Sequence, residues 1–562
     1  MALPKSASLL SAMTLVLLTA PAASAAPSKA TPSEATVTIG AQPAVIGTLL
    51  EGFLGFSYES THLRTGEFDA RGNYPQLLKN LGPGVLRFGG NTVDKDFTTS
   101  SPEALAALRR LTDATGWRVI YSENGAHLDA AAVTRDVAAV SAALGPALTA
   151  LACGNEPSSW QSKGYRPTGY GADDLPADAK RCLDAIRKGA PQVPFAGPDL
   201  ASTGMLPAYA GWAKGKIGQL DQHYYAISGC RSKDATAAGL LSRERASSAA
   251  GTIGKLSATA AGLGVPLRLS ETNSISCGGI AGVTDGYASA LWMADFLLIA
   301  AEHGAAGVNI HGGLSGTYLT GALGNAYSPI LADGEHHHTA APSYYGMLLA
   351  RQLGTGKLLE AKVSGGGNLA AHAVRNADGS TRVLLENLDG AAATVGVRPG
   401  EATGVSVLTM TAPGLDAKAG VKIQGASVAA DGSFAPGAPD HADCPGGTCR
   451  ITLAPYSAVV LSTAHAATGQ APVPVTASPT PTAAPSPSPG PSTSVTATPT
   501  PSPSSSATAP HPTASPPGTG GELASTGADG TELMALTAGT GLILLGGAVF
   551  ASQRRRGSHR RA

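Results

Sequence analysis

Two glutamates stand where short apolar runs of the sequence end. Glu156 closes the run in ALTALACGNEPSSW (residues 147–160), and Glu271 closes the run in VPLRLSETNSISCGG (residues 265–279). Such runs are typical of buried strands, and a carboxylate just past a buried strand is expected at a mouth where loops converge. Two carboxylates facing one bond can act as general acid and nucleophile in glycoside cleavage. Either glutamate alone would be read as a strand-end salt-bridge partner, but the repeated context favours the paired role.

Eight strand-like runs alternate with Ala- and Leu-rich helical stretches and would position these glutamates. The runs are LLEGFLGFSYE, GVLRFGGN, WRVIYSEN, LTALACGNE, VPFAGPDLA, IGQLDQHYY, VPLRLSETN and AAGVNIHGG. Nearly continuous apolar strands in repeated strand–helix units indicate parallel strands buried on both faces. We therefore predict an α/β fold with a (β/α)8 barrel over residues 49–343, in which Glu156 ends the fourth strand and Glu271 the seventh.

A second, smaller all-β sandwich domain is expected over residues 344–465. Short alternating strands such as TRVLLENL and CRITLAPYSAVVLS are separated there by Gly, Pro, Asn and Asp. An early strand within residues 36–48 precedes the barrel and is expected to pair into the same sandwich. Both flanks of the barrel would then build the second domain.

The two ends of the sequence predict that the protein is exported and anchored to the cell surface. Residues 1–26 combine Lys5, an apolar stretch and PAASAAPS, which is typical of a signal peptide. Residues 466–521 are dominated by Pro, Ser, Thr and Ala, which predicts a disordered stalk. Within residues 523–562, LASTG precedes an apolar run long enough for a transmembrane helix and then an arginine-rich tail that would stay cytoplasmic.

That order resembles a cell-wall sorting signal, with LASTG similar to the LAxTG variant cut by sortases. The resemblance implies that Thr526 becomes linked to cell-wall peptidoglycan. A plain membrane anchor is the alternative interpretation. Both interpretations place a secreted protein at the cell wall or cell surface.

Charge and cysteine content narrow the class of protein further. Lys plus Arg and Asp plus Glu each number 39, and the globular part has no basic run, so nucleic acid is not an expected partner. Six cysteines in an exported chain predict disulfides. Cys444 and Cys449 enclose a small loop that a disulfide could close. Cys230 and Cys277 follow two predicted strand ends and could meet above the site, which would leave the pair Cys153 and Cys182. The spacing of Cys and His predicts no metal site.

Six motifs in one order give the sequence a family resemblance. They are LRFGGN, GNEP, QHYY, SETNS, GVTDGYASALWMADFL and VNIHGG. In this combination, over about residues 49–461, the sequence resembles glycoside hydrolase family 79, which includes β-glucuronidases and heparanases. The resemblance implies a barrel plus β-sandwich, a retaining mechanism on β-linked uronic acids, and no cofactor.

The resemblance also implies roles for single residues. Glu156 is similar to the family's general acid/base and Glu271 to its nucleophile. Asn155 matches the asparagine that binds the sugar 2-hydroxyl, and Tyr224 the tyrosine that supports the nucleophile. Further sugar-binding positions match Glu59 and Asn91.

The substrate carboxylate would be held without Lys or Arg. The resemblance assigns this contact to the backbone N–H groups of Gly278 and Gly279 and to the hydroxyl of Tyr318. Ser276 stands where several members carry a tyrosine, which removes one possible donor. Arg87, in LRFGGN, either contacts substrate or ties strand ends together under the site.

The sequence therefore predicts an exo-β-glucuronidase that acts on β-linked glucuronic or 4-O-methylglucuronic acid through a covalent glycosyl intermediate. A related barrel glycosidase on a neutral sugar is one alternative. A non-catalytic surface carbohydrate-binding protein is the other.

Overall fold

The computed structural model describes residues 33–39, 45–95, 100–312, 314, 326–400 and 402–463 of the 562-residue chain. The predicted signal peptide, stalk, sorting motif with Thr526, transmembrane segment and Tyr318 lie outside these ranges. Within the ranges, no helix has both the length and the apolar character needed to cross a membrane.

Eight parallel strands form a nearly closed barrel, as predicted. In chain order they are β3 (Gly55–Glu59), β4 (Val85–Gly89), β5 (Arg118–Glu123), β6 (Leu148–Cys153), β7 (Ala196–Leu200), β8 (Gln219–Ile227), β9 (Leu267–Ile275) and β10 (Ala305–His311). Around the barrel the order is β6-β5-β4-β3-β10-β9-β8-β7. A parallel bridge between Leu151 and Phe195 links β6 to β7 and brings the two ends of this order together.

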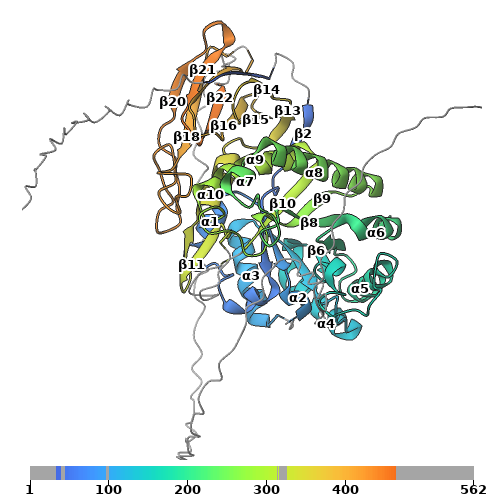
Figure 1. Cartoon of the computed structure of the whole chain (residues 1–562). Helices are drawn as coiled ribbons and strands as arrows, with labels where there is room; N and C mark the ends of the chain where they lie inside the picture. Colours follow the sequence, from blue (N-terminus) through green and yellow to red (C-terminus); the bar gives the residue numbers. More distant parts are fainter. Residues whose placement is uncertain are drawn as a thin grey trace, which may run out of the picture.

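A helix follows each barrel strand and covers the outside of the barrel (Figure 1). These helices are α1 (Tyr74–Asn80), α3 (Pro102–Thr115), α4 (Ala130–Leu144), α5 (Leu175–Gly189), α6 (Leu206–Ala213), α8 (Arg243–Leu263), α9 (Tyr287–Glu302) and α10 (Pro342–Arg351). Their ends follow local sequence signals. The Ser242 side chain caps the start of α8, and Gly264, with φ of 74°, ends it in the left-handed conformation that glycine adopts readily.

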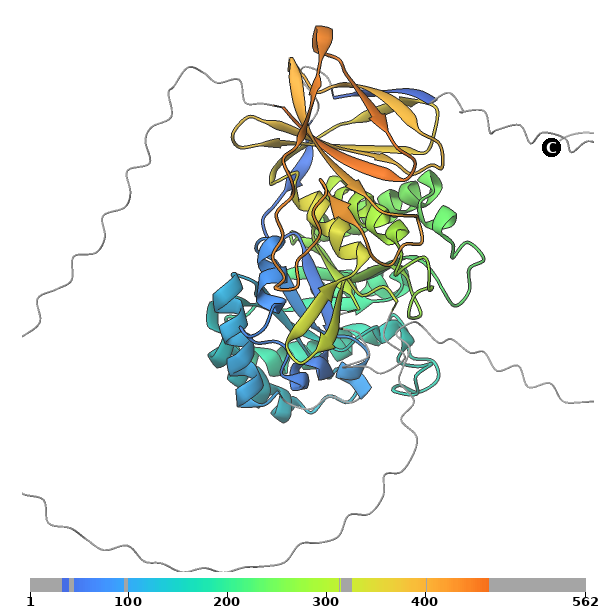
Figure 2. The same ribbon diagram turned by 90° about the vertical axis from the view of Figure 1, so that its left-hand side faces the viewer.

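The sandwich consists of two sheets stacked on one side of the barrel (Figures 1 and 2). The small sheet has the order β14 (Lys362–Gly365), β1 (Ser33–Thr38), β17 (Ala393–Arg398) and β21 (Cys449–Leu453). The large sheet has the order β19 (Lys422–Ile423), β18 (Gly404–Thr411), β22 (Ser457–Thr463), β16 (Thr381–Asn387), β15 (Leu369–Asn376), β13 (Gly356–Leu359) and β2 (Val45–Leu49), and β20 (Asp440–Asp443) pairs with β18. The N-terminal segment thus supplies one strand to each sheet.

The large sheet has two buried faces. Side chains such as Val383 and Leu385 of β16 pack toward the small sheet, in the sandwich core. Leu384 of β16 and Val374 of β15 belong instead to the core that the sheet shares with the barrel helices. Alternation along each strand therefore joins the two domains through a continuous apolar layer.

The start of the sandwich differs from the sequence expectation. Residues 342–351 form the helix α10 rather than sandwich strands, and the first strand of this part, β13, begins at Gly356. Pro342 occupies the first turn of α10, and the helix is buried along almost its whole length. An apolar stretch that is buried on all sides has no helical periodicity, which explains the misassignment.

Candidate active site

Glu271 points into the barrel mouth from β9, and both of its carboxylate oxygens accept hydrogen bonds. Arg87 Nη1 donates to Oε2 over 2.9 Å, and the Tyr225 hydroxyl donates to Oε1 over 3.0 Å. Burial raises the pKa of Glu271, but the charges of His311, His223 and Arg87 outweigh burial and hold that pKa well below its usual range. The carboxylate therefore stays ionised, as a nucleophile requires.

The sequence suggested that the seventh barrel strand ends at Glu271, but the strand continues beyond this residue. β9 continues to Ile275 and stays paired with β8 as far as Ile227. All nine residues of β9 are buried, including the polar ones after Glu271.

Glu156 lies in the loop after β6, in a conformation unusual for a residue with a side chain. Its φ is 50°, and its backbone N–H donates to the Asp199 carbonyl oxygen over 2.9 Å. Its Oε1 lies 3.2 Å from His223 Nδ1, and its Oε2 lies 3.7 Å from Lys163 Nζ. One oxygen of Glu156 and one of Glu271 lie within 4.8 Å of each other, a close spacing that favours retaining over inverting geometry.

A buried ion network supports the pair from below. Arg87 Nη2 lies 3.4 Å from Asp199 Oδ1, and His223 Nε2 lies 3.2 Å from the same oxygen. Burial lowers the pKa of His223, but the Glu271 charge and hydrogen bonds to Asp199 and Glu156 outweigh it and raise this pKa to about 9. Burial also raises the pKa of Asp199, while Arg87 and His223 bring it below its usual range. His223 is therefore a cation held between carboxylates.

Arg87 ties strand ends together under the site. Its guanidinium is fully buried and donates to Ser57 Oγ, to Glu271 and to Asn155 Oδ1. The carboxylates of Glu271 and Asp199 balance the positive charge of Arg87, so that no substrate group is needed to balance it. Of the two roles that the sequence left open for Arg87, the structure favours the supporting one.

The residues predicted to bind the sugar ring gather at the same mouth. Asn155 is held by Arg87 and, through its backbone N–H, by Asp94 Oδ2 over 2.8 Å. Asn91 Oδ1 accepts a hydrogen bond from Lys163 Nζ over 2.6 Å. The Glu59 carboxylate accepts the backbone N–H groups of Asn91 and Thr92 over 3.2 and 2.7 Å. Glu59 therefore also holds the start of the short helix α2 (Thr92–Lys95) in place.

The tyrosine that supports Glu271 is Tyr225, not Tyr224. The Tyr224 ring stacks on Phe296 of α9, with ring centroids 5.5 Å apart, on the outer side of the barrel wall. Neighbouring residues of a strand point to opposite faces, so His223 and Tyr225 share the inner face. In QHYY, an inward-facing His223 would have indicated that Tyr225 also faces inward. His223, Lys163 and Asp199 were not among the site residues predicted from the sequence.

Gly278 and Gly279 lie in a turn after β9 at the rim of the site. Both have positive φ, 82° and 84°, and a side chain at Gly279 would collide with Thr284. Ser276 and Cys277 line a cleft of about 320 Å³ together with Glu156, Glu271 and Tyr225. The exposed Arg231 also lines this cleft. Tyr318, the third predicted contact to the substrate carboxylate, is outside the described residues.

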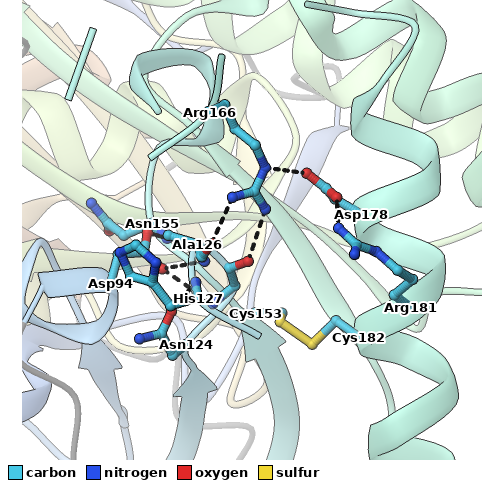
Figure 3. The surroundings of a disulfide bond; sticks show 11 residues. Asp94, Asn124, Ala126, His127, Cys153, Asn155, Arg166, Asp178, Arg181 and Cys182 are labelled. Carbon is cyan, nitrogen blue, oxygen red and sulfur yellow. Dashed lines mark hydrogen bonds and ion pairs between the residues drawn. A yellow bond between two sulfur atoms is a disulfide. The ribbon is translucent and has the colours of Figure 1, made fainter. Parts of the chain in front are cut away.

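Three disulfides brace the molecule. Cys230–Cys277 joins the loops after β8 and β9 beside the cleft, and Cys444–Cys449 closes a short loop of the sandwich. Cys153–Cys182 ties the start of the Glu156 loop to α5 (Figure 3). Beside it, Arg166 donates to the Ala126 carbonyl and pairs with Asp178. The Glu156 loop is thus held on both sides by covalent and ionic links.

Atoms of Glu156, His223 and Glu271 lie close enough together to ligate one cation. Arg87 and Tyr225 already occupy the two oxygens of Glu271, however, and Lys163 adds a positive charge beside Glu156. This arrangement suits proton transfer and nucleophilic attack better than metal binding.

Solved structures share this fold, although no protein-family model and no curated protein sequence matches the chain. A 4-O-α-L-rhamnosyl-β-D-glucuronidase from Fusarium oxysporum, solved with Rha-GlcA, has a TM-score of 0.63 and 19% identity, covering 76% of this chain and 99% of its own. A GH51 arabinofuranosidase from Xanthomonas axonopodis pv. citri has a TM-score of 0.56 and 16% identity, covering 77% and 100%. CelM2, a bifunctional glucanase-xylanase from a metagenome library, has a TM-score of 0.55 and 13% identity, covering 77% and 99%. The chain has the fold of these proteins.

Proposed function

We propose that this protein is a retaining glycoside hydrolase of the β-glucuronidase type, acting on a terminal β-linked uronic acid. The observation that carries the proposal is the close pair of carboxylates at the barrel mouth, in unlike environments. Glu271 is ionised and bound on both oxygens, whereas Glu156 Oε2 has no hydrogen-bond partner among the described residues. One group is built to attack and the other to exchange a proton.

The reaction proceeds in two steps. Glu271 attacks the anomeric carbon, the glycosidic bond breaks, and the leaving oxygen takes a proton from Glu156. Glu156, now a carboxylate, then takes a proton from water, whose oxygen attacks the anomeric carbon and releases Glu271 from the ester. We assign the contact with the 2-hydroxyl of the sugar to Asn155, which precedes Glu156 in the chain and is held by Arg87 and Asp94.

The charge balance of the site supports an acidic sugar. The cations in contact with the pair are Arg87, His223, Lys163 and His311. The acids of the same group are Glu156, Glu271, Asp199 and Glu59, of which the last two pair with His223 and His311. A proton on Glu156, which the first step requires, leaves one positive charge in excess. A uronate carboxylate offsets this charge. We propose that the backbone N–H groups of Gly278 and Gly279 and the hydroxyl of Tyr318 bind this carboxylate.

The deciding experiment compares an aryl β-glucuronide with the matching aryl β-glucoside. The wild type should prefer the glucuronide. Tyr318→Phe removes a hydrogen bond to a charged group, worth roughly 1.5 to 3 kcal/mol, and should lower kcat/KM about 10- to 150-fold on the glucuronide and little on the glucoside. A wild type that prefers the glucoside makes the protein a neutral-sugar glycosidase, and no turnover of either favours a carbohydrate-binding protein.

The proposal includes a location. We place the mature protein outside the cell, linked to peptidoglycan through Thr526 after sortase cleavage of LASTG. Muramidase should then release it from cells. Release of an intact chain by detergent alone would make the C-terminus a plain membrane anchor and would leave the catalytic proposal unaffected.

A further inference from the structure

The two glutamates of the candidate site divide the barrel mouth into two arcs. Glu156 follows β6 and Glu271 lies on β9, so one arc runs through β5, β4, β3 and β10 and the other through β7 and β8. Glu59 ends β3 and Asn91 follows β4, so that both predicted contacts to the sugar ring belong to the first arc. The second arc is then left for the group on the other side of the cleaved bond.

The cleft at the two glutamates extends along this second arc. Among the residues that line it, Thr203 follows β7, Ser228 and Arg231 follow β8, and Thr252 lies on α8. The hydroxyl groups of the first two and of Thr252 can donate and accept hydrogen bonds, as the hydroxyl groups of a sugar require. The cleft therefore offers a polar surface to the leaving group.

Arg231 adds a positive charge to this surface. Its side chain is exposed, and its guanidinium has no ion pair or hydrogen bond within the described part of the chain. The only acids among the described residues of the cleft lining are the two catalytic candidates, and other cations already contact them. Asp234, the next acid along the same loop, lies 3.8 Å from Arg245 instead. The charge of Arg231 is thus available to a group that enters the cleft.

The loop that carries Arg231 is held in place at its backbone. The Arg231 N–H donates to the Ser228 carbonyl oxygen over 3.4 Å. The preceding residue, Cys230, is bonded to Cys277 in the loop after β9. This disulfide links the backbone beside Arg231 to the strand that carries Glu271. A group on a braced loop loses less conformational freedom when it binds a ligand than a group on a free loop does.

We propose that Arg231 binds an anionic group on the leaving group, so that the substrate carries a second acidic sugar next to the terminal uronic acid. This inference rests on the proposed function and names its substrate class, an acidic glycan. A guanidinium binds a carboxylate or a sulfate through two parallel N–H donors, with a geometry that an ammonium group does not match. Arg231 takes no part in the bond changes and determines which leaving groups bind well.

The test compares three β-glucuronides whose leaving groups are galactose, galacturonate and galactose 6-sulfate. For the wild type, kcat/KM on one of the two acidic leaving groups should exceed kcat/KM on galactose about 10-fold, and that compound shows which anion is preferred. Arg231→Gln should bring this ratio to about one. Raising NaCl from about 50 to about 500 mM should lower the wild-type ratio, because the arginine is exposed, and should not change the ratio of the variant.

A matched variant of the same loop is the control. Lys233→Gln removes an exposed positive charge two residues further on, outside the cleft lining, and should keep the wild-type ratio. The inference is overturned if the wild type shows no preference for either acidic leaving group, or if the preference survives in Arg231→Gln. It is also overturned if that variant loses activity equally on all three compounds, because the arginine would then contact the terminal uronate.

The proposed function can fail separately from this inference. A wild type that prefers aryl β-glucosides over aryl β-glucuronides would contradict the uronidase assignment. β-Glucosides of the same three leaving groups would then test Arg231 through the same ratio.

Discussion

A histidine lies between carboxylates in two separate parts of the molecule, and the two places differ in what surrounds them. At the barrel mouth, His223 contacts Glu156 and Asp199, and at the domain interface His372 contacts Asp295 and Glu302. The first cluster opens onto a cleft, whereas the second is covered by the large sheet.

The two clusters also differ in the hydrogen bonds that their glutamates, Glu271 and Glu386, accept. Both oxygens of Glu271 are bound by protein groups, so that its charge is fixed before any substrate arrives. Neither oxygen of Glu386 has a hydrogen-bond partner in the described part of the chain. Similar residue types thus occur once beside an open cleft and once under a covering sheet.

The largest effect is expected from Glu271→Gln. The amide cannot form a glycosyl ester, so turnover of β-glucuronides should fall roughly 10⁴- to 10⁶-fold. Initial rates on an aryl glucuronide measure this loss. Glu34→Gln, an exposed glutamate of the sandwich, serves as the control and should keep the wild-type rate. Comparable losses in both variants would mean that the assay reports folding rather than chemistry.

The next effect concerns the acid/base. Glu156→Ala should lower kcat/KM by about 10²- to 10⁴-fold on substrates with poor leaving groups and far less on those with good ones, because only the former need a proton in the first step. Added azide should restore turnover and yield a glycosyl azide. If azide neither restores activity nor gives this product, Glu156 is not the acid/base.

The two adjacent tyrosines of β8 provide an internal comparison. Tyr225→Phe removes the hydrogen bond to Glu271 and should lower kcat/KM about 10- to 150-fold on glucuronides and glucosides alike. Tyr224→Phe, on the other face of the strand, should change activity little. Kinetics of both variants on both substrates check this, and a larger loss in Tyr224→Phe would contradict the geometry.

The smallest effect is on the dependence of stability on pH. The folded protein raises the pKa of His223 from 6.5 to about 9, so it binds that proton more tightly than the unfolded chain does. The resulting stabilisation, roughly 3 kcal/mol at most, is complete below about pH 6.5 and is lost as the pH rises toward 9. Urea unfolding between these values should show the decline. His223→Gln should flatten it, whereas exposed His303→Gln should not.

The sequence predicted the barrel and the placement of both glutamates near its mouth because strand periodicity and polar strand ends are local signals. Tyr224 was chosen over Tyr225 because a motif gives spacing without saying which residue faces inward. The support by His223 and Asp199 was not predicted, since these residues come from β8 and β7 and meet only after the barrel closes. The cluster around Glu386 gave no signal at all, because its members are isolated polar residues within apolar segments.

The N-terminal strands have a consequence for folding. β1 pairs with β17, so that Ser33 lies opposite Ala393, and β2 forms the edge of the large sheet beside β13. Contacts between residues so far apart in the chain carry a loop-closure cost and slow folding. The sandwich is therefore not a module that can be separated from the barrel by a cut before β13. A fragment that begins at Gly356 would lack one strand of each sheet, and a fragment that ends before it would leave β1 and β2 with unpaired edges.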